Sequence, residues 1–132
     1  MHNPVVIILA AGIAAWIFGA IWYTALGKVW QRAQGLNPDD CKDKKMPLGP
    51  LAITLVAEWI MAGVLYQTLT NLGTMGWVAG AIAGAVFGAG FQLTATFVMN
   101  AFPGRSIKLS LIDGVHWVCV LAIEGAIIGA LT

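Results

Sequence analysis

The chain has 132 residues, of which 59% are apolar and 10% charged, and its formal net charge at pH 7 is +1. Soluble domains contain roughly 45–50% apolar and about 25% charged residues, so this composition excludes an ordinary soluble protein. Seven Lys and Arg residues balanced by six Asp and Glu form no basic face, and nucleic-acid binding is not expected. We therefore expect one all-α domain, residues 1–132, embedded in the lipid bilayer.

Four long apolar stretches predict four transmembrane helices. A helix needs about 20 residues to cross a hydrocarbon core of roughly 30 Å. Each stretch reaches that length, and the expected bounds are residues 4–26, 48–69, 74–102 and 107–131. The predicted fold class is an integral membrane four-helix bundle.

Between the first two stretches, residues 27–47 form the one substantial polar segment, which we expect to be a cytoplasmic loop. Its first part alternates apolar and polar side chains as a helix lying on the membrane surface would. The apolar members are Val29, Trp30 and Ala33, and the polar members are Lys28, Arg32 and Gln34. Asn37 and Pro38, followed by two acids, predict a capped helical turn. The alternative is a solvated connector.

The orientation is predicted from charge. All seven basic residues fall in the first loop or around the third: Lys28, Arg32, Lys42, Lys44, Lys45, Arg105 and Lys108. Basic loops stay on the cytoplasmic side of a membrane. We therefore expect both termini outside and the chain in the bacterial inner (cytoplasmic) membrane.

Glycines recur at every fourth position of the third stretch and again in the fourth stretch. They are Gly76, Gly80, Gly84 and Gly88, followed by Gly125 and Gly129. In lipid, small residues let helix backbones approach closely. These faces could pack inside one bundle, or they could also join the subunits of a homo-oligomer, and the sequence leaves both open.

Four ionisable side chains lie inside apolar stretches: Glu58, Asp113, His116 and Glu124. Charge near the centre of a membrane helix costs about 2.5–3.5 kcal/mol, so such residues mark functional sites by default. Asp113 and His116 share one helix face, and roughly eleven steps of about 100° bring Glu124 back to it. We expect a polar stripe facing the bundle, with Glu58 at a depth between His116 and Glu124.

Carboxylates and an imidazole inside a bundle can relay protons or bind a cation. The structural alternative is that Asp113 pairs with Lys108 or Arg105 and that His116 only hydrogen-bonds Asp113. One usable histidine without paired cysteines does not match a zinc site, so no metal or other cofactor is expected. No nucleophile has an evident base and no glycine loop would hold phosphate, so an enzyme is not expected.

Two segments carry a family resemblance: residues 19–36, GAIWYTALGKVWQRAQGL, and residues 112–117, IDGVHW. They resemble the bacterial membrane proteins of domain-of-unknown-function family 1761, which are short and have four predicted spans. That family has a Trp-Tyr pair, a Gly-Lys-x-Trp motif and an Asp-x-x-His motif. The matching positions are Trp22, Tyr23, Gly27, Lys28, Trp30, Asp113, Gly114 and His116.

The resemblance covers nearly the whole chain and implies no activity. It implies that Trp22, Tyr23, Asp113 and His116, with Lys28 nearby, form a polar site at one inner corner of the bundle.

Two functional hypotheses follow. The first is a small, oligomeric permease or channel linked to a proton or cation through Glu58, His116 and Glu124. The second is an accessory or assembly subunit that binds a larger membrane protein complex. Expected partners are the lipid bilayer and either further copies of the chain or another membrane protein.

Overall fold

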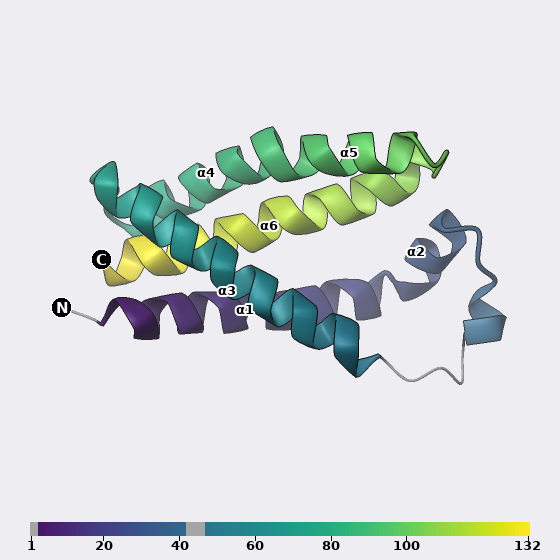
Figure 1. The fold of residues 1–132 in the computed structure, drawn as a ribbon, viewed down its shortest axis with the longest axis horizontal. Helices are drawn as coiled ribbons and strands as arrows, with labels where there is room; N and C mark the ends of the chain where they lie inside the picture. Colours follow the sequence, from purple (N-terminus) through teal and green to yellow (C-terminus); the bar gives the residue numbers. More distant parts are fainter. Residues whose placement is uncertain (1–2, 42–46) are drawn as a thin grey trace.

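The computed structural model describes residues 3–41 and 47–132, and all regular elements within them are helical. In chain order they are α1 (Pro4–Ala25), α2 (Gly27–Ala33), the 3-10 helix η1 (Pro38–Cys41), α3 (Leu48–Asn71), α4 (Trp77–Phe87), the π-helical segment η2 (Gly88–Leu93), α5 (Thr94–Ala101) and α6 (Ile107–Leu131). Figure 1 shows α4, η2 and α5 following one another as one continuous helical span.

Among the described residues, four helical spans are long and apolar enough to cross a membrane. They are Pro4–Ala25, Leu48–Asn71, Trp77–Ala101 and Ile107–Leu131, with mean hydropathies of 2.4, 1.8, 1.6 and 1.8. The prediction of an all-α chain with four such helices is confirmed.

Local sequence explains where the helices begin and end. The Asn3 side chain accepts a hydrogen bond from the Val5 amide at 2.8 Å, and the Ser106 hydroxyl caps α6 in the same way. Gly73 ends α3 with a φ of +69°, a conformation that costs glycine little.

The structure corrects several expected span boundaries: the first span ends at Ala25 rather than at residue 26, the second at Asn71 rather than at 69, and the third at Ala101 rather than at 102. The third span begins at Trp77 rather than at residue 74, because Gly76 has a φ of +88° and turns the chain. Within residues 27–47, the predicted helix and helical turn are present as α2 and η1. Along α2, the predicted polar residues are exposed and the predicted apolar ones half-buried, as on an interfacial helix. Lys42, Lys44 and Lys45 lie outside the described residues.

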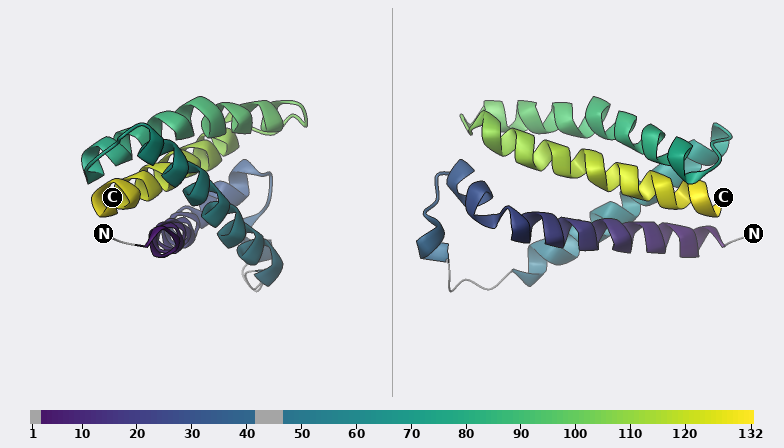
Figure 2. Two further views of the ribbon diagram at one scale, coloured as in Figure 1. Left: turned by 60° about the vertical axis from the view of Figure 1, so that its left-hand side comes forward. Right: turned by 180° about the vertical axis from the view of Figure 1, so that it is seen from behind.

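α6 occupies the centre of the arrangement. It packs against α1, α3, α4, η2 and α5 (Figures 1 and 2). α3 runs obliquely across α1 and α6, and within the described residues it makes no contact with α5. The two termini lie at one end of the molecule, and α2 and the turn between α5 and α6 lie at the other. We call these the terminal end and the loop end.

The contact between α4 and α6 is made by backbone against backbone. A methyl group added at Gly80 would overlap the carbonyl of Gly125, and one at Gly84 would overlap the carbonyl of Leu121. At the end of the same contact, the Gly76 amide donates to the Gly129 carbonyl at 3.0 Å. The regularly spaced glycines of the third span therefore face α6 of the same chain.

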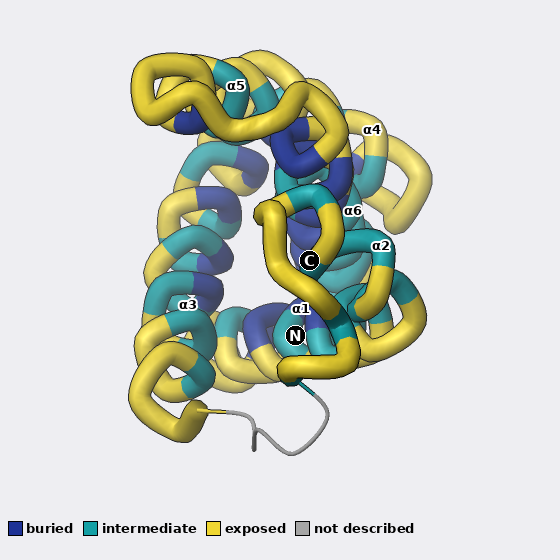
Figure 3. Tube along the Cα trace, turned by 90° about the vertical axis from the view of Figure 1, so that its right-hand side faces the viewer, coloured by how far each residue is buried: buried dark blue, intermediate teal, exposed yellow. Residues whose placement is uncertain are grey.

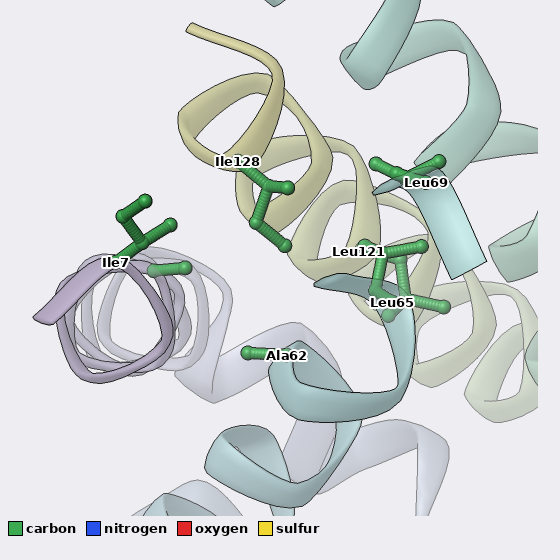
Figure 4. Packing of buried hydrophobic residues seen from close by; sticks show 7 residues of the cluster. Ile7, Ala62, Leu65, Leu69, Leu121 and Ile128 are labelled. Carbon is green, nitrogen blue, oxygen red and sulfur yellow. The ribbon is translucent and has the colours of Figure 1, made fainter. Parts of the chain in front are cut away.

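Near the terminal end, apolar side chains fill the space between α1, α3 and α6 (Figure 4). The buried side chains of this group are Ile7, Ala11, Ala62, Leu65, Leu69, Leu121 and Ile128. We call this group the terminal-end cluster. All seven of these buried side chains are apolar.

We predict that Gly84→Ala loosens the pairing of α4 with α6, because the added methyl group meets a backbone carbonyl that cannot rotate away. Overpacking of this kind costs about 1–3 kcal/mol. The matched control is Gly90→Ala on the same span, where an added methyl group meets nothing within 4 Å. Thermal unfolding in detergent should show a lower Tm for Gly84→Ala only; equal Tm values would contradict the packing described above.

Candidate functional site

A cavity of about 550 Å³ lies toward the loop end, between the first half of α3 and the helices α1, α5 and α6. It exists because α3 diverges from α5 instead of packing on it. Figure 3 views the molecule from the loop end, with α3 at the left, α5 at the top and α6 at the right. Glu58, His116 and Asp113 all line this cavity, which we call the loop-end cavity.

Asp113 joins three helices at the cavity wall. Its Oδ1 atom accepts a hydrogen bond from the Tyr23 hydroxyl at 2.6 Å and from Trp30 Nε1 at 3.1 Å. These bonds tie α1 and α2 to α6. The structural alternative, a pairing of Asp113 with Lys108 or Arg105, is wrong: no described residue forms an ion pair with Asp113, and Arg105 instead donates to Asn100 Oδ1 at 3.3 Å.

The His116 imidazole is surrounded by aromatic rings. Its centroid lies 4.9 Å from that of Tyr23 and 4.8 Å from that of Trp117. Gly19 makes room for it, since a methyl group there would come within 2.9 Å of His116 Nε2. Only 3% of the residue is exposed, and Nδ1 has no hydrogen-bond partner among the described residues. The hydrogen bond from His116 to Asp113, which the structural alternative required, is absent among the described residues.

Glu58 on α3 and Glu124 on α6 are both fully buried. None of their four carboxyl oxygens has a hydrogen-bond partner in the described part of the chain. When both carboxyl groups are charged, they repel each other. Glu58 also lines the cavity. A buried carboxylate without a partner is costly, so these groups favour a bound proton or a bound cation. Chemically, the pair can take up and release positive charge.

Three of the four residues predicted to form the polar group lie together in the structure. Asp113, His116 and Glu58 share the loop-end cavity, whereas Glu124 lies beyond its lining. Among the described residues, no group of three or more His, Cys, Asp or Glu side chains has the geometry of a metal site.

A comparison with known protein families decides the chain's membership. The family described as "Protein of unknown function (DUF1761)" matches residues 6–129. The chain belongs to the DUF1761 family. This confirms the resemblance carried by residues 19–36 and 112–117. No curated protein matches the chain, and no solved structure does.

In this DUF1761 protein, the structure changes the membership of the predicted inner-corner site. Tyr23, Asp113 and His116 meet as expected, but Trp22 and Lys28 do not line the loop-end cavity. Trp22 turns toward Phe18, with ring centroids 5.8 Å apart, because successive helix residues point about 100° apart. Lys28 lines a separate hollow of about 230 Å³.

Sequence reasoning left several cavity residues out of the site. Trp30 contacts Asp113 directly, and its position in the Gly-Lys-x-Trp motif was a usable signal. Trp117, another cavity residue, closes the IDGVHW motif, whereas Trp16, Asn100 and Arg105 line the cavity without a motif that marks them. Their shared location follows from helix packing, which no local pattern reports.

We predict that Tyr23→Phe destabilises the protein, because it removes the 2.6 Å hydrogen bond to Asp113. Hydrogen bonds to charged groups contribute about 1.5–3 kcal/mol. Tyr66→Phe is the matched control, since the Tyr66 hydroxyl makes no hydrogen bond with any described residue. Thermal unfolding in detergent measures both variants. If the two hydroxyl deletions lower the Tm equally, the Asp113 contact has no special role in stability.

Proposed function

We propose that this DUF1761 protein is a multi-pass membrane protein that carries protons or small cations, using Glu58, His116 and Glu124. One observation carries the proposal: the Glu58 carboxyl lines a cavity and is fully buried, yet neither of its oxygens has a partner among the described residues. Ionisable groups placed this way at membrane depth are typical of proton and ion pathways.

The distribution of charge supports an orientation for this pathway. Lys28 and Arg32 on α2 and Arg105 and Lys108 beside the α5–α6 turn all belong to the loop end. The Ser106 hydroxyl donates to the Ala33 carbonyl at 2.8 Å and holds these two regions together. By the positive-inside rule this end is cytoplasmic. The loop-end cavity then faces the cytoplasm, and both termini face outward.

The order of groups along the helices supports a relay. Asp113 and His116 lie near the start of α6, and Glu124 follows His116 by about 12 Å along the helix axis at 1.5 Å per residue. Glu58 reaches the cavity from α3 and interacts electrostatically with Glu124. A proton or cation entering from the loop end would meet His116 and Glu58 before Glu124.

Beyond Glu124, the terminal-end cluster closes the pathway. A single chain in this state is open toward one side only, as a carrier is in one state of alternating access. A homo-oligomer would have to meet through a face other than the glycines of α4, because α6 covers them. The alternative function is that of an accessory or assembly subunit of a larger membrane protein complex.

We predict proton entry into liposomes that contain the protein and an internal pH-sensitive dye, under an imposed membrane potential. Glu58→Gln should reduce the rate at least about tenfold, because a neutral amide cannot exchange a proton with Glu124, and each factor of ten is about 1.4 kcal/mol. Asp40→Asn, which removes an exposed acid on η1, is the control and should keep the full rate. Vesicles with wild-type protein that remain as tight as empty ones to protons, Na⁺ and K⁺ would refute the proposal.

We predict that a membrane-impermeant maleimide labels Cys41 only after the cell membrane is opened, because η1 lies in the loop-end segment. The background from the second thiol is removed by Cys119→Ser. Thr132→Cys, at the opposite end of the molecule, is the matched positive control and should react in intact cells. Labelling of Cys41 in intact cells would contradict the proposed orientation, in which the loop end faces the cytoplasm.

A further inference from the structure

The loop-end cavity has a chemical character that goes beyond a proton path. It is lined by four aromatic residues, Trp16, Tyr23, Trp30 and Trp117, together with the carboxyl groups of Asp113 and Glu58. We propose that the ligand of this cavity is an organic cation: a protonated amine or quaternary ammonium group held beside Asp113. The inference deepens the proposed function and rests on it in using the same cavity.

The wall of the cavity carries negative charge at Asp113. Both donors to Asp113 Oδ1, the Tyr23 hydroxyl and Trp30 Nε1, are neutral. They hold the carboxylate in place without cancelling its charge. The second oxygen, Oδ2, accepts no hydrogen bond from any described residue, so it is available to a ligand. A half-buried carboxylate of this kind selects a cation.

The one described basic residue of the lining does not reverse this preference. Arg105 is exposed, and its guanidinium donates to Asn100 Oδ1 at 3.3 Å. Asn100 in turn donates to the Ser110 hydroxyl at 3.1 Å, which anchors this group on the α5–α6 side. Arg105 is therefore held by a neutral network apart from Asp113, with which it forms no ion pair.

Aromatic rings line the same cavity. The rings of Tyr23 and Trp30 lie 5.0 Å apart, and the His116 imidazole continues the row 4.9 Å from Tyr23. Trp16 is fixed by its own hydrogen bond, from Nε1 to the Leu51 carbonyl at 3.2 Å. Electron-rich ring faces attract cations, and sites for quaternary ammonium groups are built from several such rings.

The cavity also has the size that an organic ligand needs. A metal ion or a proton needs no cavity of about 550 Å³. Cavities of about 300–1,000 Å³ are the usual size for small organic ligands. An apolar, aromatic compartment with a carboxylate at its wall therefore fits a small organic cation with an apolar body.

The test is calorimetric titration of the detergent-purified protein with benzyltrimethylammonium, with detergent micelles alone as the blank. We expect saturable binding. Benzenesulfonate, an anion of similar size, should bind at least about tenfold more weakly. This comparison uses the unaltered protein, so it does not depend on the folding of a variant. Absence of saturable binding of benzyltrimethylammonium at millimolar concentration, or equal binding of the anion, would overturn the proposal.

Two variants then locate the site. Asp113→Asn removes the charge but keeps an oxygen for Tyr23 and Trp30, and it should weaken benzyltrimethylammonium binding about tenfold or more. Asp40→Asn removes an exposed acid away from the cavity and should leave the dissociation constant unchanged. Equal affinity of Asp113→Asn and wild type would remove Asp113 from the site and defeat the proposal.

The same preparations separate this inference from the proposed function. Saturable, Asp113-dependent binding by protein whose vesicles pass no protons or cations would support the ligand class and refute the carrier. Proton flux that depends on Glu58, without any binding of benzyltrimethylammonium, would support the carrier and refute the ligand class.

Discussion

The direct contact of the α4 backbone with the α6 backbone determines where the other helices can lie. Lipid removes the hydrophobic drive for helices to associate, so their pairing depends on close van der Waals contact. The glycines at positions 80, 84 and 125 provide it, because no side chain separates the two backbones there. With the third span seated on one side of α6, the remaining sides of α6 are left for α1 and α3.

The loop-end cavity is a consequence of this arrangement. α3 packs on α1 and α6 but runs obliquely, so its first half separates from α5. The space between them is lined by side chains rather than closed by a helix-helix contact. Gly125 and Glu124 are neighbours on α6 and point about 100° apart, so the residue that meets α4 places the adjacent acid on another face.

The polar groups differ in how well they are satisfied. Asp113 is held by two donors from two other helices, and it stabilises the corner where α1, α2 and α6 meet. Glu58, Glu124 and His116 Nδ1 have no partner among the described residues. Groups buried in this way lower stability, and chains that keep them do so where function requires it. Asp113 therefore has partners that stabilise the fold, whereas the burial of Glu58 and Glu124 without partners would be explained by their role in the proposed pathway.

Much of the architecture follows from the sequence alone. The four apolar spans are predictable because length and hydropathy are local properties of each segment. The helix starts at Pro4 and Ile107 follow from their caps, and the family membership follows from two short motifs. The buried acids could also be identified in advance, since any ionisable residue within an apolar span stands out.

Only the tertiary structure decided which of these residues meet. Tyr23 and Asp113 are separated by 90 positions, and nothing near either one specifies the other as its partner. The orientation of α2 about its axis places Trp30, and not Lys28, against Asp113. The divergence of α3 from α5 leaves the cavity between them. Helix packing sets such contacts through the shapes of whole faces, and a face acquires its partner only when distant segments come together.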